Sequence, residues 1–294
     1  MGRTLIVFGA GSGIGDNVAA EFASKGIDHI ILLSRNTERL QNEDAPFVSK
    51  GTSSIKVDTL RIDLSDLKSI PGVLKELDSL TEGEDVEVIF FNAARIKPGE
   101  VLGVDVEEIE EDFKTTNLSL YLISQHYIPK LQALAKSNTS LKPALLVTSS
   151  HPPWDLIPQL LSLSLVKAAQ KNMVDSFRRY FGDSGIHFGL IHVEGTVAPE
   201  NKVLNPGTIA KKTLAFWESG KRECINIREE WCSVDEKRFE CYVTHLNNVS
   251  NQACCPTAAR IEKCGLRKLR PFYQSFVLSD SSIYTSGLQS APLI

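Results

Sequence analysis

The sequence predicts an α/β fold: a doubly wound parallel sheet with helices on both faces, followed by an irregular C-terminal extension. Two observations predict it. Short apolar runs alternate with segments whose apolar residues recur at helical spacing, from residue 5 to residue 227. A glycine-rich turn also joins the first run to the first helical segment. The 294 residues, 42% of them hydrophobic, can bury a full core.

The glycine-rich turn lies between a predicted strand over residues 5–8 and a predicted helix over residues 16–23. A strand, a glycine turn and a helix in this order present free backbone N–H groups that can bind a diphosphate. Glycine is needed because the turn demands unusual φ values and because a Cβ would hold the phosphates away. The residues predicted to bind cofactor here are Gly9, Ser12, Gly13, Ile14 and Gly15. A tight turn without a ligand is the alternative.

The second predicted strand covers residues 29–33 and leads into Ser34 and Arg35. In dinucleotide-binding folds the residue closing this strand meets the adenosine ribose, about 20 residues after the glycines. A carboxylate there would bind the ribose 2′-hydroxyl of NAD and repel a 2′-phosphate. Because Arg35 stands here instead, the sequence favours NADP over NAD. The alternatives are a solvated Arg35 and contacts from the polar stretch 37–53.

Two further predicted strands end in polar residues. Residues 55–62 lead to Asp63, a helical pattern covers residues 67–77, and residues 86–91 lead to Asn92. The carboxyl ends of parallel strands share one edge of a sheet, where ligands bind. The glycine turn, Arg35, Asp63 and Asn92 are therefore expected to converge there.

The second half of the chain continues the alternation. A helix is predicted over residues 106–135 with Asn117 in it, and a strand over residues 144–148 leads to Ser150. Lys167 follows in a helical segment, and the remaining elements are a strand at 187–193, a helix at 206–218 and a strand at 224–227.

In the order and spacing of these motifs, residues 3–228 resemble the short-chain dehydrogenase/reductase family, whose fold is a single Rossmann-like domain. That family carries a T-G-x-x-x-G-x-G turn, an aspartate that contacts the adenine, an N-N-A-G segment and a catalytic Asn-Ser-Tyr-Lys set. Gly9, Gly13 and Gly15 match the turn, with Phe8 in place of the usual threonine. Asp63 matches the adenine contact, and residues 91–94 are a degraded N-N-A-G.

The resemblance also implies roles for four residues. Asn117 would hold a water that relays protons, Ser150 would polarise the substrate carbonyl, and Lys167 would bind the nicotinamide ribose. Val197 lies in a segment that resembles the family's P-G-x-V-x-T, which grips the nicotinamide carboxamide. Glu194 and Pro199 replace the proline and threonine of that segment.

One departure concerns the chemistry. The family's tyrosine lies thirteen residues after the serine and four before the lysine, and Leu163 occupies that position here. Loss of a general acid costs about 10² to 10⁴ in rate. His151 is the most plausible substitute, whereas Ser164 projects about 100° around the helix and Tyr180 lies several turns away.

The resemblance implies an NADP(H)-dependent oxidoreductase that acts on a carbonyl, an alcohol or an activated double bond of a small molecule, in specialised metabolism. Leu163 keeps a second hypothesis open, a catalytically impaired dinucleotide-binding accessory protein or sensor. A third is a non-redox lyase or isomerase that uses His151. Relatives of this kind often pair through the helices carrying Asn117 and Lys167, so a homo-oligomer is also expected.

Composition excludes several other partners. The net charge of −4 and the pI near 5.9 give no general attraction to nucleic acid or to an anionic membrane. No apolar run reaches the length of a membrane span, and the first strand leaves no room for a signal peptide, so a cytoplasmic location is expected. The cysteines contain no C-x-x-C pair, so no metal site is expected. A zinc site with His245 as an extra ligand is the alternative.

The predicted domain boundary lies after residue 228. Residues 229–294 hold five cysteines and a basic cluster without sustained periodicity, which predicts a poorly ordered extension. A regulatory or partner-binding tail is the alternative.

Overall fold

A parallel sheet of seven strands forms the centre of the computed structural model, which describes residues 2–52, 54–220 and 223–229. The strand order is β3-β2-β1-β4-β5-β6-β7. The strands are β1 (Arg3–Phe8), β2 (His29–Ser34), β3 (Lys56–Arg61), β4 (Asp85–Phe91), β5 (Ala144–Ser150), β6 (His187–Val193) and β7 (Cys224–Ile227). Successive strands step outward from β1 to β3, and the chain then returns to place β4 on the other side of β1. The predicted fold class is therefore confirmed, with its topological switch point between β1 and β4.

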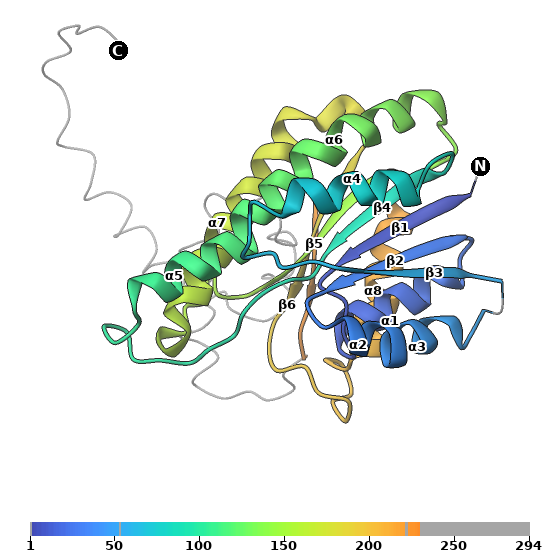
Figure 1. Ribbon diagram of the computed structural model, residues 1–294. Helices are drawn as coiled ribbons and strands as arrows, with labels where there is room; N and C mark the ends of the chain where they lie inside the picture. Colours follow the sequence, from blue (N-terminus) through green and yellow to red (C-terminus); the bar gives the residue numbers. More distant parts are fainter. Residues whose placement is uncertain (1, 53, 221–222, 230–294) are drawn as a thin grey trace, which may run out of the picture. The chain divides into compact units, whose positions relative to one another are not determined.

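Helices cover both faces of the sheet (Figure 1). One face carries α1 (Ile14–Ala23), α2 (Thr37–Arg39), the π-helical turn η1 (Leu40–Asp44), α3 (Ala45–Ser49) and α8 (Pro206–Ser219). The other carries α4 (Ile70–Leu80), α6 (Ser119–Ser137) and α7 (Leu161–Tyr180), and α5 (Val106–Phe113) with the π-helical turn η2 (Lys114–Leu118) precedes α6. The 3₁₀ turns η3 (Pro158–Leu160) and η4 (Gly182–Ser184) flank α7.

The sheet separates two apolar layers, because successive side chains of a strand point to opposite faces. Leu5 and Val7 of β1 belong to the layer under α1 and α8. Ile6 and Phe8 of the same strand belong to the layer under α4 and α6. All four side chains are fully buried, as expected for a central parallel strand covered on both sides.

The structure differs from the sequence prediction in two segments. The single helix predicted over residues 106–135 is divided by η2 into α5 and α6. Residues 37–49, part of a stretch noted in the sequence only for its polarity, are helical. The Asn36 side chain caps this segment by accepting the N–H of Arg39 at 3.0 Å.

The extension predicted for residues 229–294 lies, apart from Glu229, outside the described residues, as do all the cysteines except Cys224. Within the described segments, no helix has the length and apolar character needed to cross a membrane. The same segments contain no cluster of three His, Cys, Asp or Glu side chains that could hold a metal ion.

Gly189 in β6 lies directly against Phe216 of α8. A Cβ at this position would lie 2.5 Å from Phe216 Cε1 and 2.8 Å from Leu146 Cδ2. We expect Gly189→Ala to lower the free energy of unfolding by about 1 to 3 kcal/mol, because the surrounding core has no room for a methyl group. Urea unfolding followed by circular dichroism measures this change.

Gly72→Ala on α4 is the matched control, because an added Cβ there meets nothing within 4 Å. Alanine also favours a helix over glycine by about 1 kcal/mol, so the control should be at least as stable as the native chain. An unchanged unfolding midpoint for Gly189→Ala would contradict the packing described here.

Candidate functional site

The glycine turn between β1 and α1 is closely packed against the end of β4. Gly9 has a φ of +93°, and a Cβ on it would lie 2.9 Å from the backbone nitrogen of Ala93. A Cβ on Gly15 would lie 2.8 Å from the carbonyl oxygen of Gly9. The Asn92 Nδ2 donates to that same oxygen at 3.1 Å. Glycine is thus required at both positions, and Asn92 fixes the turn to the neighbouring strand.

The outer part of this turn offers unused backbone donors. Ser12 and Gly13 are exposed, and no carbonyl in the described part of the chain accepts a hydrogen bond from their N–H groups. Gly13 is the N-cap of α1 and supplies no side-chain cap. Exposed N–H groups at a helix N-terminus attract anions. The turn therefore fits a diphosphate.

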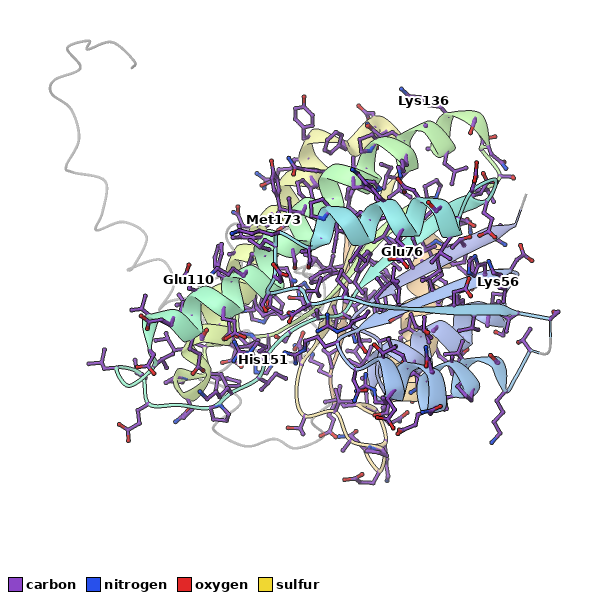
Figure 2. All side chains as sticks on the ribbon, in the orientation of Figure 1. Lys56, Glu76, Glu110, Lys136, His151 and Met173 are labelled. Atoms are coloured by element: carbon purple, nitrogen blue, oxygen red, sulfur yellow. The ribbon has the colours of Figure 1, made fainter. Side chains whose placement is uncertain are left out.

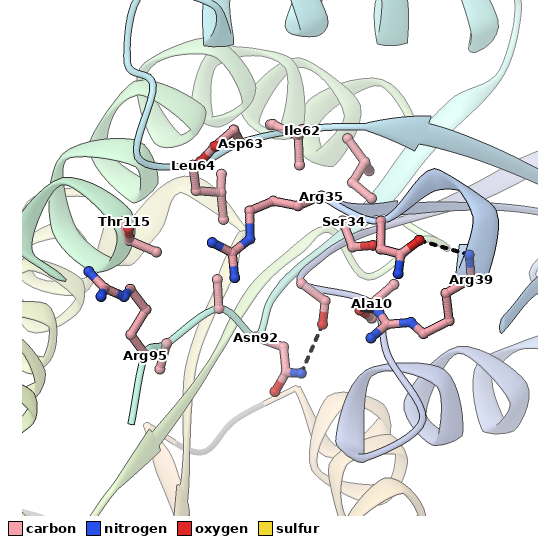
Figure 3. Close-up of a pocket in the computed structure, with 15 residues that line it drawn as sticks. Ala10, Ser34, Arg35, Arg39, Ile62, Asp63, Leu64, Asn92, Arg95 and Thr115 are labelled. Carbon is pink, nitrogen blue, oxygen red and sulfur yellow. Dashed lines mark hydrogen bonds between the residues drawn. The ribbon is translucent and has the colours of Figure 1, made fainter. Parts of the chain in front are cut away.

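A pocket of about 290 Å³ opens beside this turn, at the edge where the strands end. The lining residues come from the ends of β1, β2, β3 and β4 and from two helical segments: Gly9, Ala10, Leu33, Ser34, Arg35, Asn36, Arg39, Ile62, Asp63, Leu64, Asn92, Ala93, Ala94, Arg95 and Thr115. Figure 3 shows the Arg35 side chain extending into it beside Asp63 and Leu64. The structure thus brings together four of the predicted cofactor-binding residues, Gly9, Arg35, Asp63 and Asn92.

The lining of this pocket contains one carboxylate, Asp63, and several arginines. Burial alone would raise the pKa of Asp63, but hydrogen bonds from the Ser65 hydroxyl and N–H and the charges of Arg35 and Arg61 outweigh it and lower that pKa. Asp63 is therefore ionised at neutral pH. Its short bonds to Ser65, at 2.7 and 3.0 Å, hold the carboxylate at the end of β3.

Two further arginines, which sequence reasoning missed, line the pocket: Arg39 and Arg95. Arg39 donates from Nη2 to the carbonyl of Ala10 at 2.8 Å. Arg95 pairs with Glu111 at 2.9 Å and with Asp112 at 3.3 Å. Two features of the sequence could have indicated these arginines. Arg95 directly follows Asn92-Ala93-Ala94, and Arg39 lies three residues after the helix cap Asn36.

The residues predicted to be catalytic are linked through backbone carbonyls. Asn117 lies in η2, fully buried, and its Nδ2 donates to the carbonyl of Val166 at 3.1 Å. Lys167 donates from Nζ to the carbonyl of Thr148 at 2.8 Å and to Gln170 Oε1 at 2.9 Å. These bonds join η2, α7 and β5 within two residues of Ser150. Burial lowers the pKa of Lys167 to about 7.

Ser150 ends β5 with its hydroxyl buried, and no group in the described segments bonds it. A buried hydroxyl without a partner is costly and is common where a ligand completes the site. Leu163 is only 7% exposed, and its side chain has no proton to give. Leu163 therefore cannot supply a proton from this buried position.

Other side chains near Ser150 differ in their suitability as proton donors. His151 lies at the carboxyl-end edge of the sheet, opposite the edge where Lys56 begins β3 (Figure 2), and its Nδ1 is buried without a partner among the described residues. Tyr180, 84% exposed at the end of α7, is excluded by position. Sequence reasoning missed His192, which packs edge-on against Trp154 at 4.6 Å between ring centroids. Burial lowers the pKa of His192 to about 4, so it is neutral at physiological pH.

The loop after β6 carries the residues predicted to lie at the nicotinamide. Gly195 has a φ of +138°, and the Ala198 N–H bonds the carbonyl of Leu204 at 3.1 Å. Val197 packs against the apolar layer under α1 and α8 and does not line the pocket of Figure 3. Its predicted role at the nicotinamide therefore rests on the sequence pattern.

Comparisons with known proteins agree with this geometry. A family model for short chain dehydrogenases matches residues 3–204. Over 129 residues, 44% of this chain, the sequence is 30% identical to an NADP-dependent 3-hydroxy acid dehydrogenase of Schizosaccharomyces pombe. The matched segments span 48%, 39% and 45% of the lengths of the first three curated relatives.

Two solved structures illustrate the likeness of fold. An alcohol dehydrogenase from the archaeon Thermococcus sibiricus, complexed with 5-hydroxy-NADP, superposes with a TM-score of 0.66 at 19% identity and covers 79% of this chain and 100% of its own. The NADH-dependent reductase A1-R′, complexed with NAD, has a TM-score of 0.66 at 17% identity and covers 77% and 95%. Identities this low bear on the fold alone.

Proposed function

The chain belongs to the short-chain dehydrogenase family, and on that premise we propose that it is an NADP(H)-dependent oxidoreductase. Its substrate is a small molecule that carries a carbonyl, an alcohol or an activated double bond. The family resemblance extends the proposal to a cytoplasmic enzyme of specialised metabolism. The relative from Schizosaccharomyces pombe, named as an NADP-dependent dehydrogenase, supports the reaction class and a nicotinamide dinucleotide. Two solved structures with the same fold hold such a ligand.

The observation that carries the choice of NADP is Arg35. It is exposed, it enters the pocket at the end of β2, and the preceding residue is Ser34. A carboxylate would repel a 2′-phosphate there, whereas a guanidinium can bind it with two parallel N–H donors. Asp63 and Asn92 complete the adenosine end of the site, and the N–H groups of Ser12, Gly13, Ile14 and Gly15 receive the diphosphate.

At the other end, the nicotinamide ring donates or accepts a hydride when bound. The Ser150 hydroxyl donates a hydrogen bond to the substrate oxygen and so stabilises charge that develops there. Lys167 binds the nicotinamide ribose, and Asn117 holds a water for proton relay. Because Leu163 cannot transfer a proton, water supplies or removes it, directly or through His151.

We expect Arg35→Gln to weaken NADPH binding about tenfold, because one charge-assisted interaction with the 2′-phosphate is lost. NADH has no 2′-phosphate, so its dissociation constant should change less than twofold. Fluorescence titration of both nucleotides measures the difference.

Arg61→Gln is the matched control. Arg61 is also exposed and close enough to lower the pKa of Asp63, but it does not line the pocket. It should leave both dissociation constants nearly unchanged. An equal loss of NADPH and NADH binding in Arg35→Gln would show that Arg35 does not read the 2′-phosphate.

Leu163 favours one second candidate, a dinucleotide-binding protein without hydride transfer. In that case NADPH binds, but no carbonyl or enone substrate oxidises it. Absence of oxidation in single-turnover mixing across a broad substrate panel would exclude hydride transfer and favour this candidate.

A further inference from the structure

Three charged side chains form a network beneath the glycine turn: Asp16 of α1, Arg39 of α2 and Asp44 of η1. Arg39 donates from Nη2 to the carbonyl of Ala10 at 2.8 Å and from Nε to Asp44 at 3.0 Å. The Asp16 carboxyl accepts the N–H of Gly11 at 2.7 Å and lies beside the Asp44 carboxyl, which helps to raise its pKa. The network therefore closes on two consecutive residues of the turn, Ala10 and Gly11.

The Asp16 carboxyl retains its proton in this arrangement and can donate it to Asp44. Asp16 and Asp44 are each only 1% exposed, and a hydrogen bond between two carboxyl groups requires a proton on one of them. Burial first, and then the bond and charge of Asp44, raise the pKa of Asp16 to about 7, against the opposing effect of the Gly11 N–H and Arg39. With one shared proton the pair carries one negative charge, which Arg39 balances.

Among the described residues, Arg39 is the cation that acts on this pair, through its bond to Asp44 and its charge near Asp16. Arg3 and His29, at the amino ends of β1 and β2, pair with Glu87 and Glu84. Residues 45–49 of α3 carry no ionisable side chain. The other ionisable side chains on α1, α2, η1 and α8 are Glu21, which is partly exposed, and Glu38, Glu43, Lys211, Lys212 and Glu218, which are exposed. None of these side chains is placed to neutralise the charge of Asp16 and Asp44 when their shared proton is lost.

We propose that Asp16, Arg39 and Asp44 are positioning residues for the diphosphate of the dinucleotide, and that binding is tight only while the two carboxyl groups share a proton. The proposal rests on the function proposed above, in which the glycine turn receives that diphosphate. The network holds the backbone at Ala10 and Gly11, directly before the exposed N–H groups of Ser12 and Gly13.

The sign of the pH dependence follows from charge. When the shared proton leaves, two carboxylates face each other beneath a site that must accept a doubly charged diphosphate. Their repulsion disturbs the bond to Gly11, and their charge opposes the ligand. Affinity is therefore full below about pH 7 and falls as the pH rises through it. The same raised pKa makes folding stability decline between about pH 4, where unfolded Asp titrates, and pH 7.

The test is the dissociation constant of ADP-ribose, measured by calorimetry from pH 6.0 to 8.5 on the full chain. ADP-ribose is a suitable probe because its diphosphate has a constant charge over this range. We expect the native dissociation constant to rise about tenfold. In Asp44→Asn an amide bonds Asp16 without a shared proton, so the constant should vary less than twofold and stay low at pH 8.5.

Glu43→Gln is the matched control, because it removes the same charge from the neighbouring exposed residue and should keep the native pH dependence. Lys167 also has a pKa near 7. Its effect on the affinity for ADP-ribose is the same in the native chain, Asp44→Asn and Glu43→Gln, so it cancels when their pH profiles are compared. Asp16→Asn should likewise flatten the profile, and it replaces Asp44→Asn if circular dichroism shows that variant to be unfolded.

Two results overturn the inference alone: a native profile that is flat, and variants that bind ADP-ribose with the native pH dependence. The native profile needs no variant to fold, so the proposal stays testable in every case. Failure of ADP-ribose and NADPH to bind at any pH would instead overturn the proposed function, and this inference with it.

Discussion

Leu163→Tyr is expected to raise the rate of NADPH-dependent carbonyl reduction by about 10² to 10⁴, the contribution of a well-placed general acid. Position 163 lies one helical turn before Lys167 on α7, and both side chains are buried. A tyrosine hydroxyl introduced there would have the Lys167 ammonium as a neighbour, which lowers a phenol pKa. Stopped-flow measurement of NADPH oxidation over a panel of ketones and enones gives the rate of the chemical step.

Leu163→Phe is the control for this substitution. It adds an aromatic ring at the same buried position but carries no hydroxyl. The rate should therefore stay at the native level or fall below it. If both variants raised the rate equally, the gain would come from packing and not from proton transfer.

The result also separates the two candidate functions. A native chain that lacks activity, and gains it with the tyrosine, is a dinucleotide-binding protein on an intact enzyme scaffold. A native chain that is already active, and is not improved, obtains its proton elsewhere. In that case His151 is the first residue to replace, because it directly follows Ser150 in the chain and its Nδ1 is buried without a partner among the described residues.

The strands and most helices could be predicted because their patterns are local. A central strand such as β1 is apolar on both sides, and α8 repeats apolar residues at helical spacing, so each can be recognised without its neighbours. The π-helical turn η2 could not be predicted, because the spacing of apolar residues does not distinguish a π-helical turn from an α-helix. The segment 37–49 was missed since it is short and mostly polar, with its helix ends fixed by the Asn36 cap.

The pocket at the ends of β1 to β4 could be predicted from one rule, that parallel strands end at a common edge. That rule placed Arg35, Asp63 and Asn92 together without any knowledge of distances. The network of Asp16, Arg39 and Asp44 could not be found this way. Its members come from three elements that meet only in the folded chain, and nothing in a sequence marks two distant aspartates as a buried pair.

Gly15→Ala is expected to weaken NADPH binding about 100-fold. The added Cβ would lie 2.8 Å from the Gly9 carbonyl oxygen and 3.3 Å from Asn92 Nδ2. The turn must shift to accept it, which disturbs the bond between Asn92 and Gly9 and moves the N–H groups that face the diphosphate. Loss of charge-assisted hydrogen bonds worth about 1.5 to 3 kcal/mol corresponds to roughly 10-fold to 150-fold in affinity.

Fluorescence titration with NADPH measures this loss, and Gly51→Ala is the control because its added Cβ meets nothing within 4 Å. Comparison with Arg35→Gln shows where the effect arises. The arginine variant should discriminate between NADPH and NADH, whereas Gly15→Ala should weaken both equally, because the two nucleotides share the diphosphate. An alanine variant that still binds both nucleotides like the native chain would mean that the diphosphate does not lie on the glycine turn. The assignment of Ser12, Gly13, Ile14 and Gly15 would then fail, even though the fold that carries them is unchanged.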